Sequence, residues 1–327
     1  MNHMQLVSTA SYLPKQVVDN HALSEKVNTS DAWIQKRTGI KQRCIASCAE
    51  SSYTLGLAAA QACLAKTNRT AKSIDAVLVA TCTPPQAYPS VACKIAAELG
   101  VEECYALDIN AACSGSLYAL DLIYQQMFRP DAWETVLVVG VDTMTRLVDW
   151  HDRNSCVLFG DGAGAMLWAR SDIAGLHAVQ CRADGRGGQL LYAKDIESTD
   201  KRERLFSWDT AHVTTIMQGK EVFKSAVEKM TEVSREVLVT ANTDLQDIQW
   251  CIPHQANARI LQAVCKQLGL SERRLINTIG VHANTSAASI PLALDWGLES
   301  ETIQKGDKLL CNAFGAGFTW GAAVFTV

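Results

Sequence analysis

The sequence predicts an α/β protein made of two similar halves that share one layered core. Short apolar runs of the buried-strand type alternate with helix-like segments, and the same order of elements occurs twice. The chain has 327 residues, 48% of them hydrophobic, which is enough for a large core. We expect residues 1–175 to form the first half and 176–327 the second, with the functional site where the halves meet.

The first half is expected to contain a helix, a buried strand, a small-residue turn into a second helix, a strand and a glycine-rich strand. In order, these elements are Ser51–Thr67, Ile74–Thr81, the segment around Cys113, Val136–Gly140 and Phe159–Trp168. The second half repeats this order with Glu221–Asn242, Ile248–His254, Asn284–Leu294, Lys308–Cys311 and Phe314–Ala323. Asn284 therefore occupies the place in the second half that Cys113 occupies in the first.

Cys113 is the first candidate for a functional side chain. A short strand, Cys104–Leu107, precedes it, and a helix with apolar residues three and four apart follows it. Its neighbours are alanine, serine and glycine, which let backbone or a ligand approach closely. A thiol at a helix N-terminus has a lowered pKa and a larger thiolate fraction, as a nucleophile requires. The alternative is a buried, inert cysteine.

His254 and Asn284 are the second and third candidates. His254 ends a buried strand and precedes the helix Ala258–Leu268, so its ring would project from a strand end, where α/β proteins place active sites. A single histidine is more often structural, and an asparagine before a helix often caps it. A thiol, an imidazole and an amide at such positions of two repeats nevertheless favour a catalytic site.

Composition excludes several classes of function. The net charge of −4 argues against non-specific binding to nucleic acid or to anionic membranes. The start MNHMQLVSTASYLP lacks the basic and apolar regions of a signal peptide. Gly, Asp or Lys interrupts the longest apolar stretches well short of a membrane span. We therefore expect a soluble, cytoplasmic protein without membrane insertion.

The chain contains twelve cysteines but no CxxC pair. The closest two, Cys44 and Cys48, have no second pair or histidine cluster nearby, so no metal site is predicted. Most of the others lie in apolar surroundings and are expected to be small core residues in a reducing compartment. These are Cys63, Cys82, Cys93, Cys104, Cys156, Cys251, Cys265 and Cys311.

Two further stretches have competing interpretations. The charged, irregular segment 184–219 is either a solvated connector or a lid over a binding site, and its length favours a lid. The glycine run Gly160–Ala165 resembles a dinucleotide-binding loop only in its first glycines, because the strand-like Met166–Ala169 follows in place of a helix. The chain also lacks a Walker lysine. No nucleotide cofactor is predicted.

Four motifs, in this order, resemble the signature set of the β-ketoacyl-[acyl-carrier-protein] synthase III family. They are Ala112-Cys-Ser-Gly115, Pro253-His-Gln-Ala-Asn257, Asn284-Thr-Ser-Ala-Ala-Ser289 and Gly315-Ala-Gly-Phe-Thr-Trp-Gly321. The resemblance extends to Ser11–Pro14, Arg37–Ile40 and Phe159–Gly164, so it covers essentially the whole chain. It implies a thiolase-type, five-layered αβαβα fold, in agreement with the two predicted halves, and a homodimer.

The resemblance implies a decarboxylative Claisen condensation that initiates type II fatty acid synthesis. Cys113 would take the acyl group from an acyl-CoA thioester, and malonyl-[acyl-carrier-protein] would then lose CO₂. Nε2 of His254 and the Asn284 amide would donate hydrogen bonds to the enolate oxygen. The backbone N–H groups of Cys113 and Ala316 would form the oxyanion hole. The reaction needs no metal and no redox cofactor.

The family resemblance also assigns binding residues. Trp33 and Arg153 match the positions that hold the CoA adenine between an indole and a guanidinium plane. Tyr88 matches an aromatic residue that reaches across the dimer toward the neighbouring acyl pocket. The basic patch that would dock the acidic carrier protein consists of Lys224, Arg259 and Lys266.

Two residues depart from the family pattern. Ala283 and Ala316 stand where glycine is usual, and an added Cβ costs roughly 1 kcal/mol wherever φ must be positive.

Other functions compete with the initiating condensation. The nearest alternative is a specialised relative that uses a longer, branched or aromatic acyl group or a non-malonyl acceptor. A degradative thiolase would need a second cysteine near the C-terminal glycine run, whereas Cys311 is assigned to the core. A non-catalytic carrier-protein-binding subunit would have lost a catalytic residue.

Overall fold

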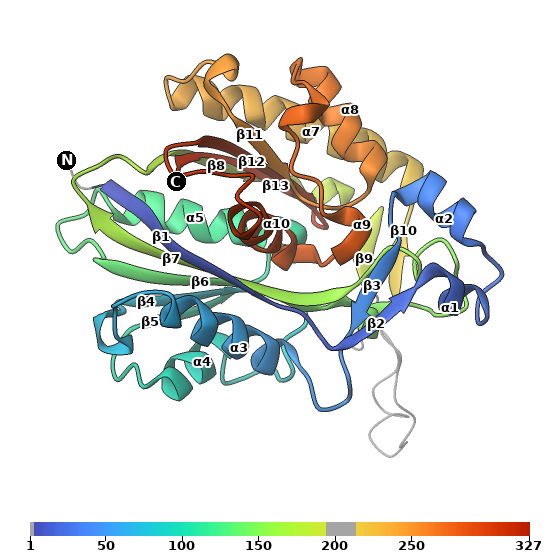
Figure 1. The fold of residues 1–327 in the computed structure, drawn as a ribbon, viewed down its shortest axis with the longest axis horizontal. Coiled ribbons are helices and arrows are strands. Elements are labelled where there is room, and N and C mark those ends of the chain that lie inside the picture. The colour runs from blue at the N-terminus through green and yellow to red at the C-terminus, as the bar shows by residue number, and fades with distance from the viewer. Residues whose placement is uncertain (1–2, 194–213) are drawn as a thin grey trace.

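The computed structural model describes residues 3–193 and 214–327, which form five layers in which helices and sheets alternate (Figure 1). A five-stranded sheet and a four-stranded sheet enclose one helical layer, and further helices cover their outer faces. This is the αβαβα arrangement that the family resemblance implied. The predicted fold class is therefore confirmed.

The five-stranded sheet belongs to the N-terminal part of the chain and has the order β1–β7–β6–β4–β5. Its strands are β1 (His3–Tyr12), β4 (Ala76–Ala80), β5 (Tyr105–Ile109), β6 (Thr135–Thr143) and β7 (Asp161–Ser171). β4 is parallel to β5 and β6, whereas β7 is antiparallel to β6 and β1. All residues of β4 and β6 are buried, because helices cover both faces of the sheet.

The four-stranded sheet belongs to the C-terminal part and has the order β8–β13–β12–β11. Its strands are β8 (Leu176–Ala183), β11 (Trp250–Pro253), β12 (Lys308–Gly315) and β13 (Thr319–Thr326). The succession of two antiparallel pairs and one parallel pair repeats that of β1–β7–β6–β4. The matching order supports the predicted boundary between residues 175 and 176, and we propose it as the division between the halves.

The predicted glycine-rich strand over Phe314–Ala323 is wrong in one respect. The chain forms two antiparallel strands there, because β12 ends at Gly315 and β13 begins at Thr319. Gly317 lies in the turn with a φ of 140°, a conformation that residues with a Cβ rarely adopt. The turn lets the chain reverse direction within three residues.

The helices lie in three layers (Figure 1). The outer face of the five-stranded sheet is covered by α3 (Ser52–Ala65) and α4 (Val91–Leu99). The central layer consists of α5 (Gly115–Gln126) and α10 (Ser289–Glu299). The outer face of the four-stranded sheet is covered by α7 (Gly219–Thr240) and α8 (Ala258–Leu268). The predicted helices of both halves are thus confirmed as α3, α5, α7, α8 and α10.

The central helices join the two halves into one core. A single buried cluster includes Leu120 of α5 and Leu294 of α10, Val138 of the five-stranded sheet and Leu309 of the four-stranded sheet. Neighbouring residues of β6 point to opposite faces, so Val139 belongs instead to the outer cluster beneath α3 and α4. Because both halves contribute to the central cluster, neither half buries its apolar surface without the other.

Smaller elements surround the place where the halves meet. They are β2 (Gln16–Asp19), β3 (Gln42–Ile45), α1 (Asn20–Ser24), α2 (Asp31–Thr38) and α9 (Ile279–His282). The predicted lid-like segment 184–219 contributes the short paired strands β9 (Leu191–Ala193) and β10 (Thr215–Met217). Its residues 194–213 lie outside the described residues. Among the described residues, no helix combines the length and the apolar character that crossing a membrane requires.

The cysteines are all free, and their burial agrees with prediction only in part. Cys63, Cys156, Cys251, Cys265 and Cys311 are buried core residues, as expected. The prediction is wrong for three others, since Cys93 is exposed and Cys82 and Cys104 are half-buried. Cys93 lies in α4 on the side that faces solvent, which the apolar residues around it in the sequence do not reveal.

Candidate active site

One cavity of about 1110 Å³ brings together the three residues singled out in the sequence. Cys113, His254 and Asn284 all line it, although they lie up to 171 residues apart in the chain. Cys113 comes from the first half, and the other two come from the second. Residues from both parts of the chain therefore line the same cavity.

Cys113 is held at the end of a strand by tight backbone packing. It lies in the 3₁₀ turn Ala112–Ser114, between β5 and α5. Gly315, at the end of β12, packs directly against this turn: a Cβ at Gly315 would lie 2.8 Å from the Cys113 backbone nitrogen. Since real Cβ contacts are longer, only glycine allows β12 to approach the backbone of Cys113 so closely.

The prediction of a lowered pKa for the Cys113 thiol is wrong. Burial raises its pKa to about 12, a hydrogen bond with Ser286 opposes this rise, and the negative charge of Asp142 adds to it. Burial of the sulfur is the largest contribution to this shift. A thiol with this pKa carries its proton at physiological pH.

His254 is fixed at both its backbone and its ring. It follows β11, and its N–H donates to the Asn312 carbonyl at 2.7 Å, which extends the pairing of β11 with β12. Nδ1 of the ring lies 2.6 Å from Ser289 Oγ. Burial lowers the pKa of His254 to about 3, so the imidazole is neutral at physiological pH. A neutral ring has one donor nitrogen and one acceptor nitrogen.

Asn284 connects the two halves and presents its amide to the cavity. Its backbone N–H donates to the Leu158 carbonyl at 2.9 Å, and its carbonyl accepts from Gly160 N–H at 3.0 Å. Its side-chain Oδ1 accepts the Ser286 N–H at 2.9 Å. Because the amide oxygen is engaged in this way, the amide nitrogen is the group that can donate to a molecule in the cavity.

The two departures from the family glycines differ in their consequences. Ala283 has φ 57° and ψ −161°, a region that strongly favours glycine. Ala316 lies in the turn after β12 and lines the cavity, and it is not among the residues with positive φ. The conformational cost considered for both sites therefore applies to Ala283 alone.

Sequence reasoning missed Ser286, Ser289 and Asp142. Ser289 contacts His254, and Ser286 hydrogen-bonds to Cys113 and to the buried carboxylate of Asp142. Asp142 also accepts from four further groups at 2.8–3.2 Å: Thr81 Oγ1, Cys82 N–H, Thr83 Oγ1 and Ala287 N–H. A lone Asp in the otherwise apolar run of β6 was the available signal, because a buried carboxylate needs hydrogen-bond donors.

The residues expected to bind CoA contact each other, but only one of them, Trp33, lines the cavity. Trp33 of α2 lines it, as does Arg37 one turn later. The guanidinium carbon of Arg153 lies 5.2 Å from the centre of the Trp33 ring, and that of Arg37 lies 5.6 Å from it. A purine stacked between Trp33 and Arg153 would have to widen their spacing.

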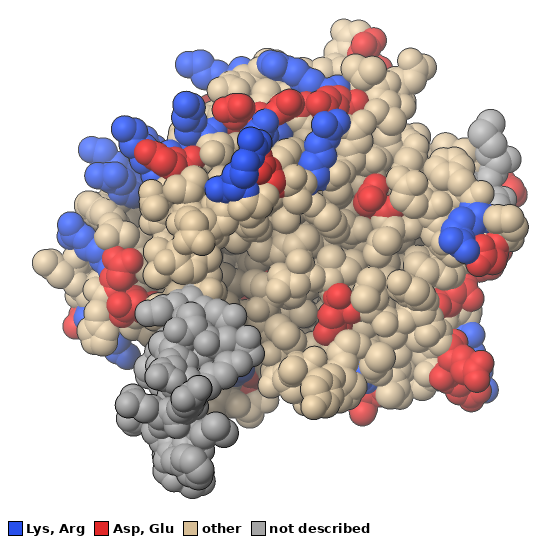
Figure 2. Space-filling view, turned by 180° about the vertical axis from the view of Figure 1, so that it is seen from behind, with Lys and Arg blue, Asp and Glu red and all other residues tan. Residues whose placement is uncertain are grey.

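The predicted basic patch lies on α7 and α8. Lys224, Arg259 and Lys266 are all exposed, and Arg259 also lines the cavity. Figure 2 shows Lys and Arg side chains along the upper edge of the molecule, where α7 and α8 lie, with acidic side chains between them. Tyr88 does not line the cavity of its own chain, and its side chain is 86% exposed.

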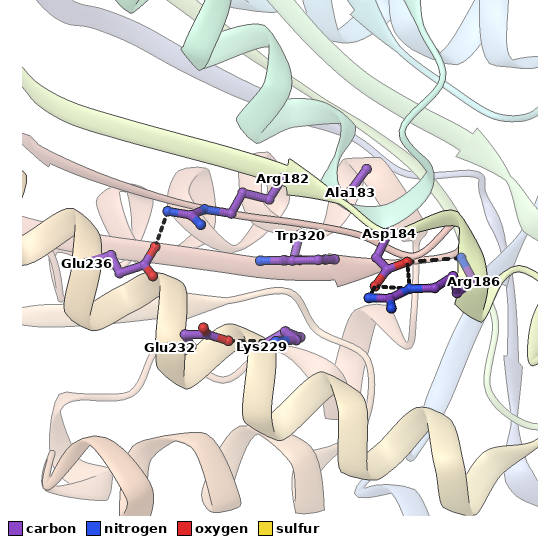
Figure 3. Close-up of a pocket in the computed structure, with 8 residues that line it drawn as sticks. All are labelled: Arg182, Ala183, Asp184, Arg186, Lys229, Glu232, Glu236 and Trp320. Atoms are coloured by element: carbon purple, nitrogen blue, oxygen red, sulfur yellow. Dashed lines mark hydrogen bonds and ion pairs between the residues drawn. The ribbon is translucent and has the colours of Figure 1, made fainter.

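A second cavity, of about 680 Å³, is less suited to catalysis (Figure 3). Its charged side chains are paired with one another: Arg182 with Glu236 at 2.7 Å, Arg186 with Asp184 at 2.5 Å, and Lys229 with Glu232 at 2.7 Å. It has no cysteine or histidine in its lining. Within the described ranges, no group of three or more His, Cys, Asp or Glu side chains is arranged to hold a metal ion.

Comparisons with known protein families match both parts of the chain. Residues 107–185 match 3-oxoacyl-[acyl-carrier-protein] synthase III, and residues 238–327 match the C-terminal part of the same synthase. The first match contains Cys113, and the second contains His254 and Asn284. The family similarity therefore includes all three residues that converge on the larger cavity.

Full-length relatives and solved structures agree with these matches. The chain is 42% identical to the β-ketoacyl-[acyl-carrier-protein] synthase III of Alkalilimnicola ehrlichii, over 99% of both chains. The corresponding protein of Sphingopyxis alaskensis is 43% identical over 98% of both. The 3-oxoacyl-[acyl-carrier-protein] synthase III of Aquifex aeolicus has a TM-score of 0.91, 38% identity, and coverage of 99% of this chain and 100% of its own. The priming β-ketosynthase of the R1128 polyketide pathway has a TM-score of 0.92 and 31% identity, with coverage of 99% and 96%.

Proposed function

The chain belongs to the β-ketoacyl-[acyl-carrier-protein] synthase III family, and we propose that it works through an acyl-Cys113 intermediate. As a member of this family it is an acyltransferase that carries out the initiating condensation of fatty acid synthesis. The proposed reaction joins an acyl-CoA primer to malonyl-[acyl-carrier-protein] and gives a 3-oxoacyl-[acyl-carrier-protein]. The main support for the proposal is that Cys113, His254 and Asn284 all line one cavity.

In the first step, Cys113 Sγ bonds to the acyl carbon of the primer and the bond between that carbon and the CoA sulfur breaks. The thiol proton leaves with the CoA sulfur, so the step is neutral overall. Since burial raises the pKa of Cys113 to about 12, attack and proton transfer must be coupled. The N–H groups of Cys113 and Ala316 stabilise the negative oxygen that forms during attack.

In the second step, malonyl-[acyl-carrier-protein] loses CO₂ and becomes an enolate. His254 and Asn284 donate hydrogen bonds to the enolate oxygen, and each donor in such a site stabilises the transition state by about 3–4 kcal/mol. The Asn284 amide nitrogen is available because Ser286 N–H engages the amide oxygen. The enolate carbon then bonds to the acyl carbon, and the bond between that carbon and the Cys113 sulfur breaks. The sulfur leaves as a thiolate and takes one proton from water, which balances the negative charge that the departing CO₂ left behind. No metal and no redox cofactor takes part.

Binding of both substrates is proposed on the same cavity. The CoA adenine stacks between Trp33, which lines the cavity, and Arg153, whose guanidinium lies over the indole ring. The acidic carrier protein docks on the patch formed by Lys224, Arg259 and Lys266, which brings its malonyl arm to the cavity that Arg259 lines. The residues of segment 184–219 that line the cavity, such as Leu191 and Met217, support its role as a lid.

We further propose that the enzyme is a homodimer in the cytoplasm. β5 is an edge strand of its sheet within the described residues, and Tyr88 is 86% exposed on a single chain. A partner pairing along β5 would bury this edge, and Tyr88 would then reach the partner's acyl pocket. The twelve free cysteines support a reducing compartment.

A specialised priming role is the second candidate, since a priming β-ketosynthase of polyketide synthesis is 31% identical with the same fold. Retention of Cys113, His254 and Asn284 argues against a non-catalytic carrier-protein-binding subunit. The test is conversion of malonyl-carrier protein in the presence of acetyl-CoA, followed by the intact mass of the carrier protein. The expected product is acetoacetyl-carrier protein with the native enzyme and none with Cys113→Ser. An unchanged malonyl-carrier protein in both samples would refute the proposal for acetyl-CoA.

A further inference from the structure

The hydroxyl of Ser289 has few partners, and they determine where its proton lies. Ser289 is the first residue of α10, and its side chain is buried. Its Oγ lies 2.6 Å from His254 Nδ1 and accepts the Gln255 backbone N–H at 3.4 Å. Among the described residues, the hydrogen bonds of Ser289 Oγ involve these two groups alone.

The Gln255 backbone N–H is itself held in place. The Gln255 side chain donates to the carbonyls of Pro253 at 2.7 Å and Ile276 at 3.3 Å, and it accepts Thr278 N–H at 2.8 Å. The residue is fully buried. These contacts fix the direction of the Gln255 backbone N–H, so that one lone pair of Ser289 Oγ is permanently engaged.

The proton of the Ser289 hydroxyl then needs an acceptor. A serine hydroxyl has a single proton, and the acceptor within reach is the Nδ1 of His254. If Nδ1 accepts this proton, the ring hydrogen of the neutral imidazole must reside on Nε2. In the opposite tautomer, Nδ1–H would donate to Ser289 Oγ and the hydroxyl proton would be buried without an acceptor, which is unfavourable. Burial lowers the pKa of His254 to about 3, so the ring is neutral and exists in one of two tautomers.

We propose that Ser289 is a positioning residue that holds His254 in the tautomer with hydrogen on Nε2. The inference rests on the proposed function, because Nε2–H is then the donor that the enolate oxygen of the malonyl thioester requires. The same tautomer leaves no lone pair on Nε2 to receive the Cys113 proton. Ser289 therefore keeps His254 as a hydrogen-bond donor for the decarboxylation step. It also prevents His254 from acting as the base in self-acylation.

The tautomer can be measured directly in the native protein labelled with ¹⁵N-histidine. Couplings between the ring nitrogens and the ring carbon-bound protons show which nitrogen carries hydrogen at pH 7. The His254 signals are identified by their loss in His254→Gln. We expect an unprotonated Nδ1 and a protonated Nε2, and a protonated Nδ1 would overturn the proposal. This readout needs no activity, so the proposal can fail independently of the proposed function.

Kinetics provide the second test, with malonyl decarboxylation and self-acylation measured separately. Ser289→Ala is expected to slow decarboxylation on the order of tenfold or more, and self-acylation less than about threefold. Ser289→Thr keeps the hydroxyl and is expected to retain most of the decarboxylation rate. Thr231→Val is the control, because the buried Thr231 hydroxyl donates to the Val227 carbonyl of its own helix and, among the described residues, to no other group. Equal losses in both steps for Ser289→Ala, or no loss, would contradict the proposal. If Ser289→Ala does not fold, Ser289→Thr and the tautomer in the native protein decide the question.

Discussion

Alkylation of Cys113 as a function of pH tests the protonation state of its thiol. Burial raises the pKa of this thiol from an ordinary value of 9.0 to about 12. A shift of about three units lowers the thiolate fraction roughly a thousandfold at neutral pH, which corresponds to about 4 kcal/mol. Because the thiolate is the reactive form, the rate with iodoacetamide should rise about tenfold for each pH unit from 7 to 9.5, without a plateau.

The rate is measured by timed exposure to iodoacetamide and peptide mass spectrometry of the Cys113 peptide. The exposed Cys48 reports reagent quality in the same sample, and circular dichroism confirms that the fold persists at each pH. Ser286→Ala should lower the Cys113 rate further, because the Ser286 hydrogen bond lowers the thiol pKa. A plateau below pH 8 would refute the reasoning, since it would mean that the helix N-terminus stabilises a preformed thiolate despite burial.

Three further predictions concern the donors, the docking patch and the strained alanine. His254→Ala or Asn284→Ala should each slow malonyl decarboxylation by about 10²–10³ and self-acylation much less, in separate radiometric assays; equal losses would mean that these residues mainly hold the site together. Lys224→Glu combined with Lys266→Glu should raise the KM for malonyl-carrier protein about tenfold and leave that for acetyl-CoA within about twofold, and an unchanged carrier-protein KM would place the docking surface elsewhere. Ala283→Gly should change the free energy of unfolding in urea by less than about 1 kcal/mol, because relief of about 1–3 kcal/mol of strain offsets the flexibility of glycine and the lost methyl group. A loss of about 2 kcal/mol or more would show that φ at Ala283 is not strained.

The buried strands could be predicted from the sequence because both of their faces are covered. β4 and β6 are continuous apolar runs for this reason, and they were found at nearly their observed positions. The outer strands β1 and β8 mix buried with exposed residues and were not anticipated. The end of β12 was joined to β13 because the residues between these strands are small or aromatic, and only the conformation of Gly317 reveals the turn.

The three side chains that converge on the cavity could be singled out from the sequence, but the residues that contact them could not. Cys113 and His254 follow strand ends and have side chains whose chemistry is distinctive. Ser289 and Asp142 act through contacts between distant parts of the chain: Ser289 is 35 residues from His254, and Asp142 is 145 residues from Ala287. The direction of the Cys113 pKa shift was missed for the same reason, since the exclusion of water depends on both halves closing around the sulfur.

The most direct test of the central claim is the intact mass of the enzyme after incubation with acyl-CoAs, followed by a chase with malonyl-carrier protein. The panel runs from acetyl to decanoyl and includes branched and aromatic chains, with Cys113→Ser as the control. We expect a mass gain equal to one acyl group from acetyl or a short branched chain, located on Cys113 and removed by the chase. Labelling by long or aromatic chains alone would instead indicate the specialised priming role. Normal acylation of Cys113→Ser would contradict the account.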